Sequence, residues 1–154
     1  MRRKPNRSHV VNLSLNILDF WIGDWEAEWK SNNGEIKKGR NSIHAILGEC
    51  VIFEEFDGRP GNTLVGKSLS VFDPRSGKWK QTWVDNSGGY LDFSGEFKDN
   101  KMTLSREIQT HDGKRIQRMV WYNISPVEFD WNWEISNDDG TTWWVVWQIY
   151  YTRL

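Results

Sequence analysis

The clearest pattern of apolar and polar positions lies near the end of the chain, in residues 127–153. Within residues 129–135, apolar and polar side chains alternate strictly: Phe129, Trp131, Trp133 and Ile135 against Asp130, Asn132 and Glu134. A period of two is typical of a β-strand with one buried face. The following Asp139 and Gly140 tolerate the positive φ angles that a tight hairpin turn requires. The pattern therefore predicts a β-hairpin.

The second arm of this hairpin, residues 143–151, is apolar on both faces. One face is expected to carry Trp143, Val145, Trp147, Ile149 and Tyr151, and the other Trp144, Val146, Gln148 and Tyr150. A strand of this kind usually has protein or ligand on both sides. Because an isolated two-stranded ribbon is marginal in water, the rest of the chain must supply the sheet that it completes.

The same alternation, interrupted by short turns, runs through most of the preceding sequence. Turn signals include the segments S-N-N-G at 31–34 and D-P-R-S-G-K at 73–78. Together with the hairpin, the pattern predicts about ten strands, at 24–30, 36–47, 49–56, 64–72, 79–85, 90–97, 102–108, 115–124, 129–135 and 143–151. Regularly spaced strands with short turns are typical of an all-β antiparallel meander.

The N-terminal region differs from this pattern. Residues 1–12 are basic and contain Pro5, so we expect a flexible arm, followed by a single domain over residues 13–154. Ser14 could cap a short helix that carries Leu15, Leu18 and Phe20 or Trp21 on one face. Such a helix could close one end of the sheet.

The edges of so many antiparallel strands must be protected, and closure into a barrel does this most completely. We therefore predict a closed β-barrel of about ten strands with a short N-terminal helix. A two-sheet sandwich is the structural alternative.

Composition and charge exclude several classes of protein. Twenty basic and twenty-one acidic residues give a net charge of −1, so no overall charge draws the chain to nucleic acid or to an anionic membrane. Cys50 is the single cysteine, which excludes an intramolecular disulfide and a cysteine-based zinc cluster. No run of apolar residues is long enough for a membrane helix, and the N-terminal apolar region is too weak for an export signal. We predict a cytoplasmic protein.

Several segments carry a family resemblance. D-F-W-I-G-D-W at 19–25 resembles the G-x-W signature of lipocalins and their relatives. Later segments resemble the uncharacterised bacterial family known as domain of unknown function 1579: G-K-S-L-S-V-F-D-P at 66–74, W-V-D-N-S-G-G at 83–89, R-M-V-W-Y-N-I-S-P at 118–126, F-D-W-N-W-E-I-S-N-D-D-G-T-T-W at 129–143 and Y-T-R at 151–153. The resemblance spans residues 18–153. It implies a lipocalin-like barrel of the calycin group, and it brings no established activity or catalytic residues.

The similar barrels called nitrobindins hold haem through a histidine near the C-terminus. The histidines of this chain are His9, His44 and His111, so the matching ligand is missing. No histidine has a second one at ligand spacing, and we predict neither a metal site nor a cofactor. The sequence contains no G-x-S-x-G motif and no glycine-rich phosphate loop, and we assign no catalytic residue.

Eleven tryptophans are the unusual feature of the composition. Most of them could simply be core residues, but a barrel of this size need not be filled, and several could line an internal cavity. An Arg118–Glu134 pair on adjoining strands could anchor a ligand's polar group or could only hold the register. The candidate ligand-binding residues are Trp25, Trp83, Arg118, Trp121, Trp131, Trp133, Glu134 and Trp147.

These candidates support three hypotheses about function. The first is a binding protein that takes a small, largely hydrophobic molecule inside the barrel. The second is an enzyme that acts on such a molecule by acid–base chemistry. The third is a filled barrel that works through a protein–protein surface, such as the face of a homodimer. Glu54, Glu55 and Glu107 also lie in predicted strands, where we expect them on the solvated face.

Overall fold

The computed structural model of the chain describes residues 17–154, and these form ten β-strands. The strands are β1 (Gly23–Lys30), β2 (Ile36–Ile46), β3 (Val51–Asp57), β4 (Val65–Asp73), β5 (Lys78–Asp85), β6 (Tyr90–Lys98), β7 (Lys101–Thr110), β8 (Gly113–Tyr122), β9 (Glu128–Ser136) and β10 (Trp144–Arg153). Each lies within a few residues of a strand that the alternation predicts.

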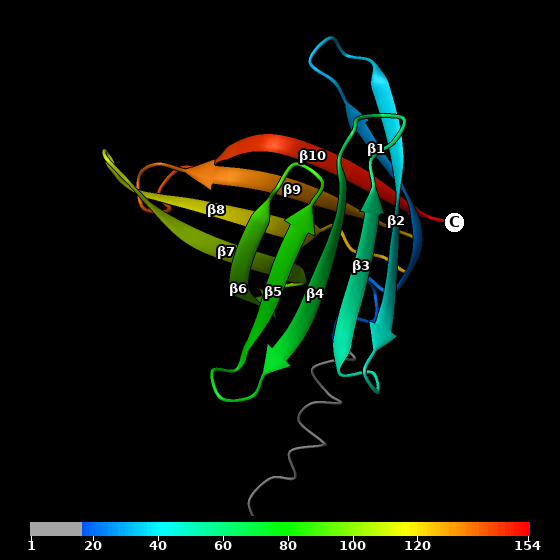
Figure 1. Cartoon of the computed structure of the whole chain (residues 1–154), viewed down its shortest axis with the longest axis horizontal. Coiled ribbons are helices and arrows are strands. Elements are labelled where there is room, and N and C mark those ends of the chain that lie inside the picture. The colour runs from blue at the N-terminus through cyan, green and yellow to red at the C-terminus, as the bar shows by residue number, and fades with distance from the viewer. Residues whose placement is uncertain (1–16) are drawn as a thin grey trace, which may run out of the picture.

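The strands form one closed antiparallel barrel in which each strand pairs with its neighbours in sequence. The barrel closes between β1 and β10, where Trp25 pairs with Arg153 and Ala27 with Tyr151. In Figure 1, β7 to β10 cross β1 to β4 at a steep angle, as two halves of a strongly twisted sheet. The predicted all-β barrel is confirmed, and the alternative sandwich is not formed.

The second arm of the C-terminal hairpin differs from the prediction because β10 contains a β-bulge. The register with β9 shifts between Val145 and Trp147, so the side chains on the two sides of this irregularity no longer follow one alternation. Trp143 precedes β10, and its ring lies 3.5 Å from the guanidinium carbon of Arg118. The prediction that Trp143 and Trp147 share one face is therefore wrong.

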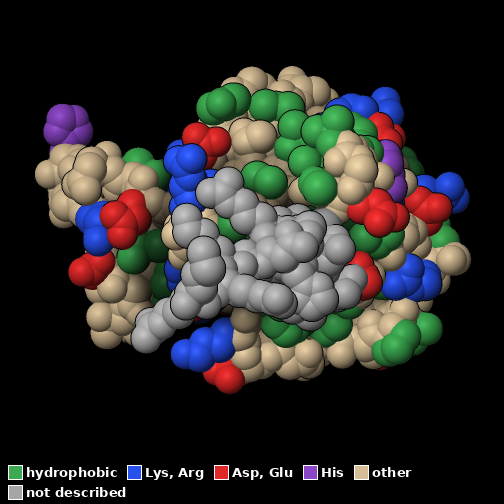
Figure 2. Space-filling model, turned by 90° about the horizontal axis from the view of Figure 1, so that it is seen from below, with side chains coloured by type: hydrophobic (Ala, Val, Ile, Leu, Met, Phe, Trp, Pro, Cys, Tyr) green, Lys and Arg blue, Asp and Glu red, His purple; other side chains and the backbone are tan. Residues whose placement is uncertain are grey.

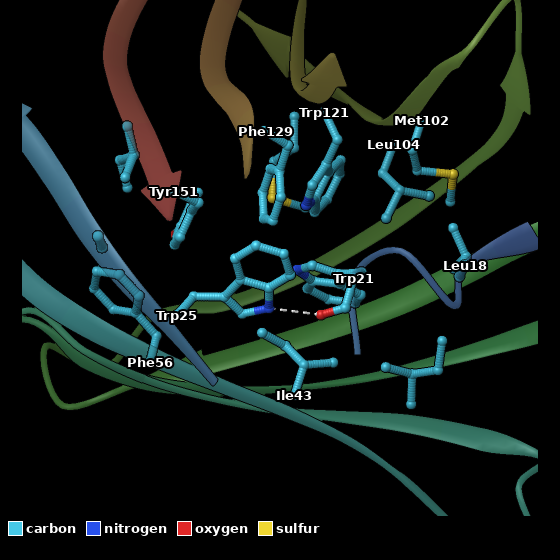
Figure 3. Close-up of a cluster of buried hydrophobic side chains, with 14 of the residues drawn as sticks. Leu18, Trp21, Trp25, Ile43, Phe56, Met102, Leu104, Trp121, Phe129 and Tyr151 are labelled. Carbon is cyan, nitrogen blue, oxygen red and sulfur yellow. Dashed lines mark hydrogen bonds between the residues drawn. The ribbon is translucent and has the colours of Figure 1, made fainter. Parts of the chain in front are cut away.

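The segment before β1 closes one end of the barrel. The amide of Trp21 donates to the carbonyl of Leu18 at 3.0 Å, which makes a tight turn, and both side chains are buried. Trp21 packs edge-on against Trp121 at 5.4 Å between ring centroids (Figure 3). Phe20 packs against Phe129 at 5.9 Å. The predicted arm over residues 1–12 and the predicted cap at Ser14 lie outside the described residues.

The outer surface carries charges of both signs on neighbouring strands. Lys38 pairs with Glu26 at 2.8 Å and Lys67 with Glu55 at 2.6 Å, each pair joining two adjacent strands. On the face in Figure 2, basic and acidic side chains are interspersed with hydrophobic ones, and no charge of one sign dominates. Among residues 17–154, no helix has the length and apolar character needed to cross a membrane.

Candidate functional site

A cavity of about 200 Å³ lies inside the barrel. Its wall is mostly aromatic and aliphatic and includes the carboxylic acids Glu54 and Asp85. The other lining residues are Phe56, Leu64, Trp83, Leu91, Phe93, Met119, Trp121, Trp131, Trp133, Trp147, Ile149 and Tyr151. Leu64, Trp83, Asp85 and Leu91 are partly exposed and lie where β5 ends and where β4 and β6 begin. Because neighbouring strands are antiparallel, this rim lies at the opposite end from the turn at Leu18–Trp21.

Five of the tryptophans predicted to bind a ligand come together in this wall: Trp83, Trp121, Trp131, Trp133 and Trp147. Period-two alternation places them inside, since Trp131 and Trp133 lie two positions apart on β9 and pair across the sheet with Ile149 and Trp147 of β10. Their rings pack edge to face: Trp131 lies 6.4 Å from Trp121 and 5.7 Å from Trp147, centroid to centroid.

The sixth predicted tryptophan, Trp25, lies at the closed end and does not line the cavity. It is 0% exposed, its ring centroid is 4.7 Å from that of Phe129, and its indole N–H donates to the carbonyl of Trp21 at 2.9 Å (Figure 3). The guanidinium carbon of Arg153 lies 4.2 Å from its centroid on another side. These contacts make Trp25 part of the packed core.

Arg118 and Glu134 are paired as the sequence suggested, but they lie outside the cavity. Nε and Nη2 of Arg118 donate to Oε2 of Glu134 at 3.1 and 3.0 Å. Their chain neighbours Met119 and Trp133 face the cavity, so the pair is on the outer face of the sheet. Trp143 covers the guanidinium there, and Glu134 is buried.

The buried carboxyl of the cavity wall is instead Glu54 on β3. It is 8% exposed; Asn41 Nδ2 donates to Oε2 at 2.7 Å, and Ser68 Oγ donates to Oε1 at 2.8 Å. Burial raises the pKa of Glu54, and the two hydrogen bonds oppose this only in part. Burial, with the charge of Glu54, also holds the pKa of Tyr151 far above its usual range. The expectation that Glu54 lies on the solvated face is therefore wrong.

Glu54 belongs to a polar stripe on the inner face of β2 to β5. Its other members are buried and neutral: Asn41, Ser68, Ser70 and Gln81. Gln81 Nε2 donates to Ser70 Oγ at 2.9 Å, whereas Oε1 of Gln81 and Oδ1 of Asn41 find no hydrogen-bond partner among the described residues. The stripe thus contains two buried side-chain oxygens that accept no hydrogen bond from the described residues.

The second carboxylic acid, Asp85, lies at the rim of the cavity. Its Oδ2 accepts the indole N–H of Trp83 at 2.8 Å, and its Oδ1 accepts the amides of Ser87 and Gly89 at 2.9 and 3.0 Å. Although partial burial opposes it, hydrogen bonds led by those from Ser87 and Trp83 lower the pKa of Asp85 to about 2. Gly66 leaves room for the Trp83 ring, because a Cβ there would lie 2.1 Å from it. Asp85 is therefore ionised and holds Trp83 in place.

In the described part of the chain, no three side chains of His, Cys, Asp or Glu gather as they would around a metal ion. The site offers an aromatic cavity, one buried carboxyl and one ionised carboxylate at its rim.

Replacing Glu54 with glutamine should change how stability depends on pH. The pKa of Glu54 is raised above its ordinary value of 4.5. The carboxyl therefore contributes stability below about pH 4.5 that is lost as the pH rises through its folded-state pKa. Glutamine loses no proton, so the melting temperature of Glu54→Gln minus that of the unaltered protein should rise from about pH 4 to about pH 8. Thermal unfolding followed by circular dichroism at several pH values measures this difference.

The neighbouring Glu55 provides the matched control because it points outward. Its pKa is lowered, chiefly by its hydrogen bond with Lys67, so the corresponding difference for Glu55→Gln should fall as the pH rises. The same slope for both variants would contradict the different surroundings of the two carboxyls.

Together, the fold and the site define a class: a closed antiparallel β-barrel with an aromatic internal cavity. The chain belongs to the family described as "Protein of unknown function (DUF1579)", which matches residues 15–153. The family suggested by the sequence segments is thus confirmed. No curated protein matches the chain.

Several solved structures match the chain, and one of them illustrates the shared fold. It is titled "Crystal Structure of Rv2717c from M. tuberculosis", has a TM-score of 0.58 and is 11% identical in sequence. The match covers 92% of this chain and 97% of that one. At this identity the likeness concerns the fold alone.

Proposed function

We propose that this barrel binds a small, largely apolar molecule in its cavity, with Glu54 as the polar group that orients it. The observation that carries the proposal is a buried carboxyl in an otherwise aromatic and aliphatic wall. Apolar pockets with a few convergent polar groups are the usual form of small-molecule sites. A filled barrel acting only through its surface is disfavoured because the interior holds this cavity.

The volume limits the size of the ligand. A dry apolar cavity of roughly 150 Å³ is enough to bind benzene. The cavity of about 200 Å³ is therefore suited to one aromatic ring with a compact substituent. Its partly exposed rim provides the route of entry at the end away from Trp21.

tert-Butylbenzene, one ring with a compact apolar group, is a suitable probe for this proposal. We expect it to bind with a Kd on the order of 10–100 μM, as small apolar ligands of this size commonly do. Leu91→Trp adds bulk to the cavity wall and should weaken binding at least about tenfold. Tryptophan fluorescence titrations measure both affinities.

Leu69→Trp is the matched control because Leu69 is exposed on the outer face of β4. It should leave the affinity for tert-butylbenzene unchanged. No binding to the unaltered protein, or equal weakening by both variants, would overturn the proposal.

The raised pKa of Glu54 favours one second candidate, an enzyme that acts on the same ligand by acid–base chemistry. A carrier returns its ligand unchanged, whereas an enzyme converts it. Mass spectrometry of a ligand released after incubation with the protein would separate the two.

A further inference from the structure

Every ionisable group in the cavity wall becomes negative when it ionises. Its charged or chargeable groups are the carboxyls of Glu54 and Asp85 and the phenol of Tyr151, and among the described residues no Lys, Arg or His lines it. Asp85 is ionised at the rim, with its pKa lowered to about 2. In a low-dielectric interior, such a wall favours a positive charge over a negative one.

The aromatic rings of the wall add to this preference. Neighbouring rings stand nearly perpendicular to each other, with interplanar angles of 78° for Trp121–Trp131, 89° for Trp131–Trp147 and 83° for Phe93–Trp133. Perpendicular rings form adjacent walls of a box. Aromatic boxes that contain tryptophan are the usual protein sites for quaternary ammonium groups, because the negative ring faces attract a cation.

The polar stripe that contains Glu54 also favours a positively charged ligand. Asn41 and Ser68 both donate to the Glu54 carboxyl, which is how a protein stabilises a carboxylate, and Oδ1 of Asn41 and Oε1 of Gln81 remain unpartnered acceptors. Neither oxygen lines the cavity, so the acceptors that a ligand meets in the wall itself are the carboxyls of Glu54 and Asp85 and the hydroxyl of Tyr151. These groups complement a cation better than they complement a carboxylate.

We propose that the ligand of this cavity is a small organic cation, an amine or quaternary ammonium group on a compact apolar body, whose charge lies between the tryptophan rings and the carboxyl of Glu54. This inference rests on the proposed function, since it names the chemical class of the molecule bound at the same site. The cation loses its hydration on entry, and the ring faces and the carboxylate offset that loss.

Such a ligand makes binding depend on pH. Without it, burial favours the protonated form of Glu54; a cation beside the carboxyl replaces that proton. The groups facing Glu54 are the neutral Asn41 and Ser68 and the phenol of Tyr151, which stays protonated, while Asp85 at the rim is ionised over the same range. The affinity for a cation should therefore rise as the pH rises through the pKa of Glu54, and that for a neutral molecule should not.

Phenyltrimethylammonium and tert-butylbenzene test the proposal because they have the same shape and differ by one charge. We expect the cation to bind the unaltered protein roughly tenfold more tightly at about pH 8, the factor that about 1.4 kcal/mol of cation–aromatic and carboxylate attraction supplies. This preference should shrink as the pH is lowered to about 5, where Glu54 is protonated to a larger extent. Isothermal titration calorimetry in buffers of different ionisation enthalpy should also detect proton release on binding of the cation alone.

Glu54→Gln should lower the affinity for phenyltrimethylammonium about tenfold and change that for tert-butylbenzene much less, because the neutral probe offers no charge to the carboxylate. Circular dichroism measures whether the variant is folded. Glu55→Gln, one position away on the outer face, should alter neither. A cation that binds no more tightly than its neutral counterpart, or equally well to Glu54→Gln, overturns this inference and leaves the proposed function standing. If neither probe binds, the proposed function itself fails.

Discussion

Replacing Trp25 with alanine is expected to lower the free energy of unfolding by about 3–5 kcal/mol, the usual cost of removing a buried tryptophan. Trp25 is 0% exposed and contacts three groups at once: the ring of Phe129, the carbonyl of Trp21 and the guanidinium of Arg153. Alanine would leave a cavity at the centre of the closed end. It would also remove the hydrogen bond that ties the turn before β1 to the barrel.

Thermal unfolding by circular dichroism measures this effect. At roughly 2–4 °C per kcal/mol for a domain of this size, the melting temperature should fall by about 10 °C. Trp144→Ala is the control, since Trp144 is 67% exposed at the start of β10 and its removal should cost less than about 0.5 kcal/mol. Similar losses in the two variants would contradict the role assigned to Trp25.

The two ends of the barrel differ in how they are packed. At the closed end the interior is filled by aromatic rings, where Trp21 packs against Trp121 and Trp25 against Phe129 (Figure 3). The inner face of β2 to β5 carries the polar stripe in the middle of the barrel, where Asn41 pairs with Trp25 and Ser70 with Ile52, and the cavity lies toward the open end. Because one end is fully packed, the other end can leave space and keep a buried carboxyl without loss of the fold.

Most of the fold could be predicted because a strand with one buried face has period two, and each turn carries glycine, asparagine or proline. The bulge in β10 could not be predicted in this way. Val145, Val146 and Trp147 are all apolar, so the sequence has no polar residue there to mark the extra position. Alternation alone therefore groups Trp143 with Trp147 on one face, although Trp143 covers Arg118 outside the barrel.

Period-two alternation also predicted part of the candidate site. Trp131 and Trp133 follow the alternation of β9, and the structure places both in the cavity wall. Glu54 was missed because a charged residue in a strand is usually solvated, which outweighed its position on the same face as Ile52 and Phe56. That shared face was the signal that could have identified it.

For the Arg118–Glu134 pair, the sequence predicted the contact but not its surroundings. The sequence placed the two residues on adjoining strands, where they are indeed paired. Alternation alone, however, does not tell which face of these strands the loop that follows β9 will cover. Here the loop after β9 brings Trp143 over the outer face, and a partly buried ion pair lies there without any ligand cavity.

Arg153→Lys is expected to cost about 1.5–3 kcal/mol although the charge is kept, because hydrogen bonds of a charged donor are lost. The guanidinium of Arg153 donates to the carbonyls of Pro126, Ile22 and Phe20 at 2.8, 2.9 and 3.3 Å, while its plane lies over Trp25. It thus joins β10 to the turn before β1 and to the loop before β9. A lysine ammonium is too compact to reach these three carbonyls together.

The melting temperature should fall by about 3–12 °C, at roughly 2–4 °C per kcal/mol. Arg115→Lys is the matched control, because Arg115 is exposed and donates only to Asn137 in the described structure, and its effect should be below about 0.5 kcal/mol. An Arg153→Lys variant as stable as the control would show that the charge alone, and not the three-way hydrogen bonding, secures the closed end.

Since the closed end lies away from the cavity rim, Arg153→Lys should still bind tert-butylbenzene with unchanged affinity at a temperature where it is folded. Stability and binding would then have been changed separately, as the division of the barrel into two ends requires.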